Sequence, residues 1–168
     1  SKASLRVSAY GDVDELNSFL GLARARIADQ ALQQLLGQIQ NDLFVIGADL
    51  ATPVPDPVQG NSGSMRRVSQ SEVESLEKSI DLYNDSLPPL KEFILPAGNE
   101  AGALLHVARA VARRAERGAV RLSEDAAEAG KINPQTITYL NRLSDLLFVL
   151  ARVVNRQGGP AEVFAEFR

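Results

Sequence analysis

One stretch of the chain, residues 99–127, concentrates side chains that could do chemistry. The stretch is predicted to be a helix, and five polar residues recur in it at offsets of three, four, three and one: His106, Arg109, Arg113, Glu116 and Arg117. At 100° per residue these positions fall along one face, opposite a face rich in alanine. Arginine dominates the polar face, and its planar guanidinium suits bidentate recognition of phosphate. We therefore predict an anion site here, with a solvated stripe of i,i+4 pairs as the alternative.

A second polar cluster interrupts the apolar pattern of the last predicted helix, which opens with Asn133 and Pro134. Asn141 and Asp145 lie four residues apart, so they share a face of that helix. Hydrogen bonds between helices would explain a single buried polar group. Together with the arginines, however, the pair favours an anion site between two helices. In the first predicted helix, Asp14 taken alone is interpreted as a partner of the helix dipole.

Several familiar chemistries are set aside by the residues that the chain lacks. It holds one histidine and no cysteine, so it cannot build the Glu-x-x-His pairs of di-iron bundles, a thiolate metal site or a disulfide. Neither a G-x-x-x-x-G-K-[ST] phosphate loop nor a dinucleotide-binding G-x-G-x-x-G occurs. His106 is expected to be a helix-surface or bridging residue.

The bulk composition is that of an ordinary globular chain. The 168 residues are 45% hydrophobic and 23% charged, and this length suits one domain with a sizeable core. The net charge of −3 provides no basic field, so neither nucleic acid nor a membrane surface is an expected partner. No apolar run approaches the ~20 residues that span a bilayer. The lack of cysteine and of a signal peptide predicts a cytoplasmic protein.

Five segments have the periodicity of amphipathic helices, which predicts an all-α, five-helix antiparallel bundle with residues 1–168 as one domain. The helices are predicted at about 12–27, 30–51, 71–85, 99–127 and 134–157. Capping boxes at Asp12 with Glu15, and at Ser71 with Glu74, set two of the starts. Residues 53–70 are rich in Pro, Gly, Ser and Asn and are expected to form a mobile loop. Residues 93–98 are expected to be extended, with no sheet to join.

Five motifs follow one another in register, and together they are far more specific than any one of them. They are Y-G-D-V-D-E-L-N-S at 10–18, F-I-L-P at 93–96, L-H-V-A-R at 105–109, R-R-A-E-R at 113–117 and Y-L-N-R-L-S-D at 139–145. With them the chain resembles the PduO-type ATP:corrinoid adenosyltransferases, from residue 1 to about residue 155. The resemblance implies an enzyme that moves the 5′-deoxyadenosyl group of ATP to the cobalt(I) of cobalamin or another corrinoid, with triphosphate as the second product.

The resemblance also implies an assembly and a nucleotide site. The family is a ferritin-like five-helix bundle that forms a homotrimer, with each active site between two subunits. ATP and its Mg²⁺ would be bound by Lys2, Arg113, Glu116, Arg117 and Asn141. Glu116 and Asn141 would lie at the end of the nucleotide that carries the metal.

On the corrinoid side, the resemblance implies that Asp14 pairs with Arg109 across the subunit interface. Phe93 would lie beneath the corrin, on the lower axial face of cobalt. The catalytic residues implied are Arg113, Asp14, Arg109 and Phe93. A reductase or an adenosylcobalamin-dependent enzyme would be a further partner.

Two features depart from the family pattern. Family members carry a phosphate loop of the T-x-x-G-D-x-G kind ahead of the position of Ser1 and Lys2, and the numbered chain is expected to lack this segment. Ala97 also replaces the usual glycine after Pro96. Two alternatives therefore stay open: a non-catalytic regulator that binds ATP or a corrinoid on the same bundle, and a helical interaction module with no small ligand.

Overall fold

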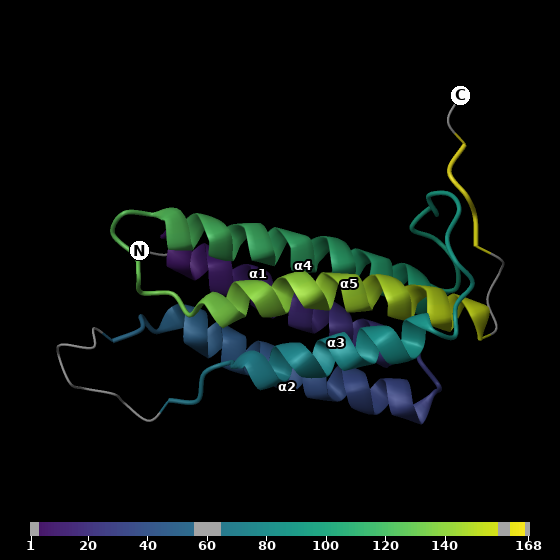
Figure 1. Ribbon diagram of the computed structural model, residues 1–168, viewed down its shortest axis with the longest axis horizontal. Coiled ribbons are helices and arrows are strands. Elements are labelled where there is room, and N and C mark those ends of the chain that lie inside the picture. Colours follow the sequence, from purple (N-terminus) through teal and green to yellow (C-terminus); the bar gives the residue numbers. More distant parts are fainter. Residues whose placement is uncertain (1–3, 56–64, 158–161, 167–168) are drawn as a thin grey trace.

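The computed structural model describes residues 4–55, 65–157 and 162–166, and in these residues the chain forms a five-helix bundle (Figure 1). The helices are α1 Leu5–Arg24, α2 Gln30–Ala51, α3 Gln70–Asn84, α4 Glu100–Glu124 and α5 Pro134–Arg156. Consecutive helices alternate in direction, so α3 runs parallel to α5, against which it packs. The predicted all-α bundle is confirmed.

Each helix begins directly after its N-cap residue, and the N-caps predicted for α1 and α3 were wrong. α1 begins at Leu5, where the Ser4 hydroxyl accepts a hydrogen bond from Val7 N at 3.3 Å. The apolar period of α1 extends back past Asp12, which therefore lies inside the helix instead of capping it. The capping box of α3 is Ser69 with Glu72, two residues earlier than predicted. Here the Glu72 carboxylate accepts the Ser69 amide at 2.9 Å.

The remaining helix boundaries agree closely with the sequence. α2 has the predicted bounds, and its N-cap Asp29 accepts hydrogen bonds from the amides of Ala31 and Leu32. α5 opens with Asn133 as N-cap and Pro134 in the first turn, as predicted. α4 is capped by Asn99 and ends at Glu124, slightly before the predicted end.

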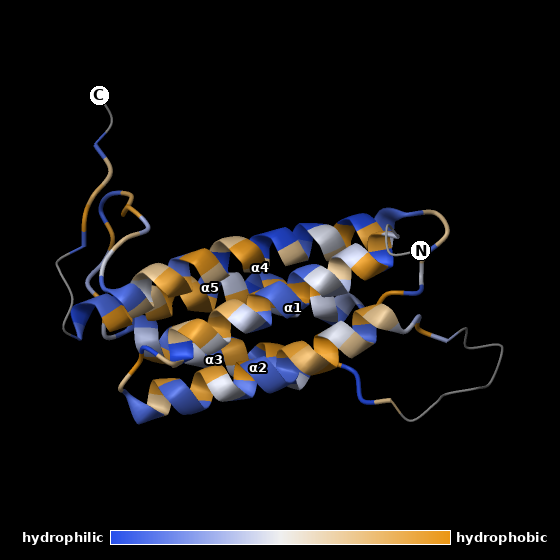
Figure 2. Cartoon of the chain, turned by 180° about the vertical axis from the view of Figure 1, so that it is seen from behind, coloured by the Kyte–Doolittle hydropathy of each residue, from blue (hydrophilic) through white to orange (hydrophobic). Residues whose placement is uncertain are grey.

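The core depends on the small side chains of α4. This helix packs closely against α1 and α5, and a row of alanines makes the approach possible because a methyl group is the whole side chain. The fully buried members of this row are Ala108, Ala112, Ala115 and Ala119. Hydrophobic and hydrophilic residues alternate along the helices (Figure 2). Arg113 and Arg117 are exposed whereas the alanine row is buried, so the polar face of α4 points away from that row.

One end of the bundle is tied together by a buried carboxylate. Asp49, 1% exposed, accepts hydrogen bonds from Asn133 Nδ2 at 2.7 Å and Val68 N at 3.2 Å, and it pairs with Arg67. These contacts hold one flank of the loop predicted at 53–70. On the other flank, Val54 N donates to Lys131 O at 2.8 Å. Residues 56–64 lie outside the described part of the chain, so the mobility of the loop stays a prediction.

At the opposite end, the segment at 93–98 is extended as predicted, but it does have a partner. Leu95 N donates to Val163 O at 2.7 Å, and Ala165 N donates to Phe93 O at 2.8 Å. The two segments run side by side as a short antiparallel pair beyond the end of the bundle (Figure 1). The described residues form no sheet, and the partner of this segment is a single stretch at 162–166 that meets it in one isolated bridge. Within the described residues, no helix is long and apolar enough to cross a membrane.

Candidate functional site

A hydrogen bond between α4 and α5 joins two of the predicted site residues. Asn141 Nδ2 donates to Glu116 Oε1 at 2.9 Å, and both side chains are half-buried. The alternative for Asn141, a hydrogen bond between helices, is therefore realised at the predicted anion site itself. Asp145 does not join this contact, because Arg142 donates to it at 3.0 Å on the outer side of α5.

Two arginines flank this hydrogen bond in sequence. Arg113 and Arg117 lie four residues apart on α4, so they project from the same face, and both are exposed. Among the described residues neither makes a hydrogen bond or an ion pair. The chain thus presents two guanidinium groups without an internal anion beside a carboxylate and a carboxamide. This arrangement suits a polyphosphate that brings its own cation.

A third arginine on the same helix behaves differently. Arg114 Nε donates to Asp12 Oδ1 at 3.0 Å, and Arg114 also pairs with Glu15. These contacts tie α4 to α1. Asp12 and Glu15, predicted as a capping box, are instead the anionic partners of Arg114.

Polar atoms without partners lie further along the stripe on α4. His106 is 3% exposed, and neither ring nitrogen has a hydrogen-bond partner in the described residues. Burial, reinforced by the nearby guanidinium of Arg109, lowers the pKa of His106, while Glu162 opposes the shift. The buried Nε of Arg109 also lacks a partner in that part of the chain. His106 was expected to be a helix-surface or bridging residue, and the surface position was wrong because the residue is buried, with its ring edge-on against Phe148 at 6.2 Å between centroids.

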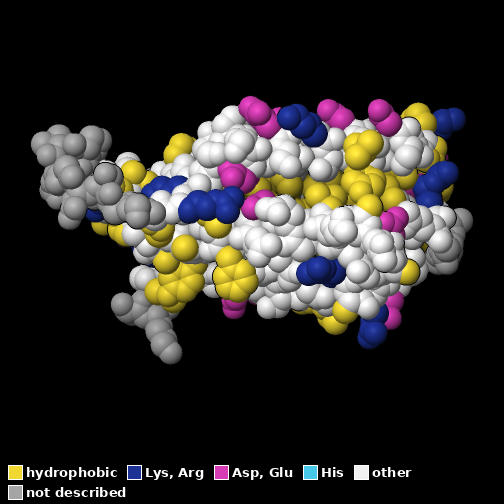
Figure 3. Space-filling view, turned by 90° about the horizontal axis from the view of Figure 1, so that it is seen from below, with side chains coloured by type: hydrophobic (Ala, Val, Ile, Leu, Met, Phe, Trp, Pro, Cys, Tyr) yellow, Lys and Arg dark blue, Asp and Glu magenta, His cyan; other side chains and the backbone are white. Residues whose placement is uncertain are grey.

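Asp14 lies apart from these groups within one chain. It is exposed and lines a groove of about 430 Å³ between α1 and α2. Phe44, which also lines this groove, is 72% exposed. Apolar side chains gather at the surface on the side of the molecule where α2 lies (Figure 3). In the described residues Asp14 forms no ion pair with Arg109, so their predicted pairing requires a second subunit.

Phe93 lies at the end of the bundle with its side chain 75% exposed. It therefore does not plug the end of the bundle in a single chain. Lys2, the last predicted nucleotide contact, falls outside the described residues.

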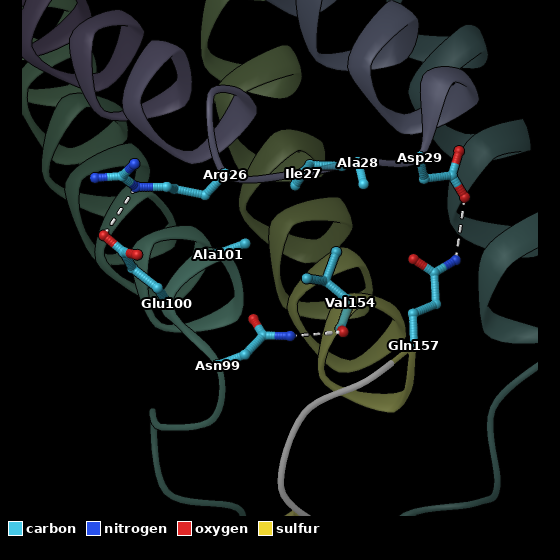
Figure 4. A pocket seen from close by; sticks show the side chains of 9 residues that line it. All are labelled: Arg26, Ile27, Ala28, Asp29, Asn99, Glu100, Ala101, Val154 and Gln157. Atoms are coloured by element: carbon cyan, nitrogen blue, oxygen red, sulfur yellow. Dashed lines mark hydrogen bonds and ion pairs between the residues drawn. The ribbon is translucent and has the colours of Figure 1, made fainter.

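A pocket of about 330 Å³ opens where α4 begins and α5 ends, but it does not resemble a phosphate site. Its polar groups already bind one another (Figure 4). Arg26 pairs with Glu100 at 2.9 Å, and Gln157 Nε2 donates to Asp29 at 3.1 Å. This pocket is therefore a poorer candidate for the predicted anion site than the exposed arginines of α4.

Metal binding by the chain alone has little support. Within the described residues, no group of three or more His, Cys, Asp or Glu could hold a metal ion. Glu116 and Asn141 are in contact through Oε1 and Nδ2, and each side chain has a further oxygen atom that could act as a donor to a metal. Two such donors fit Mg²⁺ that arrives on a nucleotide, because this ion usually keeps phosphate and water as its other ligands.

Two polar residues at the end of α5 were not predicted from the sequence to have a role. Arg152 and Asn155 are 3% and 5% exposed, and their side chains hold the loop that carries Phe93. Arg152 interrupts the apolar run at 149–154 and Asn155 ends it, and this was the available signal.

Comparison with known proteins covers almost the whole chain. A family model described as cobalamin adenosyltransferase matches residues 1–154. The corrinoid adenosyltransferase of Mycobacterium leprae is 49% identical over 156 residues, which cover 92% of this chain and 81% of that protein. The Bacillus subtilis enzyme of the same name is 42% identical over 166 residues, covering 96% and 80%.

A solved structure has the same fold. It is a phenylalanine-to-alanine variant of the PduO-type ATP:corrinoid adenosyltransferase from Lactobacillus reuteri, complexed with cobalamin and ATP. It matches with a TM-score of 0.88 at 38% identity, covering 99% of this chain and 89% of that chain.

Proposed function

The chain belongs to the cobalamin adenosyltransferase family, and on this premise we propose that it transfers the 5′-deoxyadenosyl group of ATP to the cobalt of a corrinoid. The proposal rests on two arginines, Arg113 and Arg117, that have no anionic partner among the described residues and flank Glu116, which accepts a hydrogen bond from Asn141. A single hydrophobic core draws residues from all five helices. We therefore treat the chain as one domain, with its substrates at the surface of the bundle.

The reaction is an in-line displacement at a carbon atom. The electron pair of cobalt(I) in the substrate forms a bond to the C5′ atom of ATP, and the bond from C5′ to the phosphate oxygen breaks. That oxygen leaves with the bonding pair as triphosphate. No general base is needed, because the nucleophile carries no proton. The protein's task is to align the two substrates and to stabilise the charge that develops on the leaving group.

The residues of α4 and α5 match this task. Arg113 and Arg117 donate hydrogen bonds to oxygens of the departing triphosphate. Glu116 and the carbonyl oxygen of Asn141 meet the Mg²⁺ that accompanies ATP, and the hydrogen bond between the two side chains orients that carbonyl. Lys2 contacts the nucleotide from the N-terminal segment.

We propose that the active site is completed in a homotrimer. Three side chains support this: Asp14 and Phe44, which one chain leaves exposed, and Arg109, which has no anionic partner among the described residues. Pairing of Asp14 with Arg109 of a neighbouring copy satisfies both charges and orders the corrinoid side. Sedimentation should give three times the mass of the chain, and a stable monomer at micromolar concentration would contradict this assembly.

Phe93 acts as an apolar wall beneath the corrin. A ring in this position keeps water and other ligands off the lower face, which leaves cobalt(II) four-coordinate and easier for an external one-electron reductant to reduce. Because Phe93 is 75% exposed, Phe93→Ala should change the free energy of unfolding by only about 0.5 kcal/mol, whereas loss of a buried plug would cost ~3–5 kcal/mol. A four-coordinate cobalt(II) signal that is undiminished in this variant, by electron paramagnetic resonance with MgATP, would refute the wall.

The reaction itself can be tested directly. The protein is incubated without oxygen with MgATP and chemically reduced cobalamin, and the light-sensitive spectrum of adenosylcobalamin should appear. If ATP raises the melting temperature but no adenosylcobalamin forms, the chain is a regulator that binds the nucleotide. If neither occurs, it is a helical interaction module.

We further propose that the enzyme acts in the cytoplasm, where its nucleotide substrate is available, and receives electrons from a reductase. An adenosylcobalamin-dependent enzyme is the expected recipient of the product. Co-purification of either activity with the protein from a cell extract would support these partners, and recovery of the protein in another compartment would contradict the location.

A further inference from the structure

The loop that carries Phe93 is held at both ends by one face of α5. Arg152 Nη2 donates to Pro88 O at 2.9 Å, and Asn155 Nδ2 donates to Ala97 O at 2.9 Å. Arg152 and Asn155 are three residues apart, so their side chains leave the helix on the same side. The two carbonyl oxygens that they bind lie five residues before Phe93 and four residues after it.

The anchor at Asn155 is unusually tight. Its Oδ1 accepts a hydrogen bond from Asn99 N at 3.0 Å, so this one carboxamide joins the end of the loop to the first residue before α4. Two glycines make room for it. A Cβ atom added at Gly98, where φ is +128°, would lie 2.1 Å from Asn155 Oδ1, and one added at Gly102 would lie 2.0 Å from it. Asn99 Nδ2 in turn donates to Val154 O at 2.9 Å (Figure 4).

The anchor at Arg152 reaches a third segment. Arg152 Nε donates to Glu162 Oε1 at 2.7 Å, and the Arg152 side chain is 4% exposed. The residues after Glu162 then pair with the backbone of the loop through Phe93 O and Leu95 N. The backbone of Phe93 is thus placed by contacts that lead back to two side chains on α5.

From this geometry we propose that Arg152 and Asn155 are positioning residues for Phe93. They touch neither substrate; they set the height and angle of the loop so that the ring lies flat against the lower face of the corrin. The inference rests on the proposed function, because it matters only if Phe93 faces a corrinoid. A purely structural role for the same contacts would stabilise the fold and leave the chemistry of each folded molecule unchanged.

Asn155→Ala and Arg152→Lys test the proposal. The first removes both hydrogen bonds of the carboxamide, and the second keeps a positive charge for Glu162 but loses the planar fork that reaches Pro88 O as well. We expect kcat to fall about 10- to 100-fold, as for a misplaced reacting group. The KM for ATP should stay within about twofold, because Arg113 and Arg117 are untouched. The four-coordinate cobalt(II) signal with MgATP should fall in parallel.

A matched control lies on the same helix. Tyr139→Phe removes one buried hydrogen bond, the one from the tyrosine hydroxyl to Asp42 at 3.0 Å, far from the loop. It should lower the melting temperature and leave the cobalt(II) signal intact. Hydrogen exchange gives a second readout: the amides of Leu95 and Ala165 should exchange faster in Asn155→Ala and Arg152→Lys than in the control.

The outcomes separate the two proposals. A wild-type protein that makes no adenosylcobalamin would remove the proposed function. An active wild-type protein whose variants behave like Tyr139→Phe, with lower stability and unchanged signal and kcat, would overturn the positioning role alone. If Asn155→Ala does not fold, Arg152→Lys decides the question by the same measurements.

Discussion

Two neighbouring arginines on α4 show how one residue type serves two purposes. Arg114 turns toward α1, where Asp12 and Glu15 both pair with it. Arg113 projects from another face and has no anionic partner among the described residues. An arginine whose charge is already balanced contributes to the fold. An arginine left unbalanced beside Glu116 and Asn141 is available to a ligand, and this difference in partners, not residue type, marks the site.

The same distinction extends along the helix. Arg109 and His106 are more buried than Arg113, yet their polar nitrogens lack partners in the described part of the chain. Burial without a hydrogen bond is costly, so these nitrogens differ from those of Arg113, which is exposed to water. The polar face of α4 therefore divides into a paired part that holds α1, an exposed part at Arg113 and Arg117, and a more buried part at His106 and Arg109.

The largest effect on turnover is expected from the loss of Arg113. Arg113→Ala should lower kcat about 10²- to 10³-fold, as the loss of one preorganised donor to a developing anion does. The melting temperature should barely change, since Arg113 has no partner to lose among the described residues. Steady-state assays with MgATP and reduced cobalamin, together with thermal unfolding, measure both quantities. A variant that melts well below the wild type but turns over normally would show that Arg113 serves the fold and not the ligand.

A smaller loss is expected from the acidic partner on α1. Asp14→Asn should reduce kcat/KM for the corrinoid about 30-fold, because Arg109 then lacks a charged partner across the interface. The KM for ATP should stay near the wild-type value. Equal losses toward both substrates would argue against the pairing, as would a structure of the assembly in which Asp14 lies far from every Arg109.

Arg114→Ala is the matched counterpart of Arg113→Ala. It removes two partly exposed ion pairs, each worth about 0.2–1 kcal/mol, so the free energy of unfolding should fall by about 1 kcal/mol. Turnover per folded molecule should stay within about twofold, because Arg114 faces α1. Urea unfolding at low and high salt checks the ionic origin of the effect, which added salt should diminish. A kinetic loss as large as that of Arg113→Ala would abolish the comparison.

The smallest effect concerns His106, whose pKa is influenced by the charges of Arg109 and Glu162. Burial lowers its pKa in the folded protein below the value of about 6.5 in the unfolded chain. The unfolded state then binds more protons near pH 6, so stability should decline as the pH falls from about 7.5 to 5.5. His106→Phe, which keeps an aromatic ring against Phe148, should flatten this dependence. If the free energy of unfolding depends on pH with the same slope in both proteins, this prediction is wrong.

Much of the bundle was predictable because helices depend on near neighbours in sequence. The cap of α5 at Asn133 and Pro134 and the bounds of α2 were correct, since each rests on contacts within one turn or on a regular apolar period. The start of α1 was misplaced because Asp12 looks like a cap in isolation. Its true partner, Arg114, lies 102 residues away, and no local pattern can reveal it.

The candidate site likewise has features that the sequence predicts and features that depend on tertiary packing. By itself, the sequence determined the helices, the residue types at the anion site and the spacing that sets Arg113 and Arg117 on one face. Only the tertiary structure decided that Arg114 is paired while Arg113 is open, that His106 is buried, and that Asn155 fits against Gly98 and Gly102. The physical reason is that a helical face follows from a period of 3.6 residues, whereas the partner of a charge follows from the packing of helices far apart in the chain.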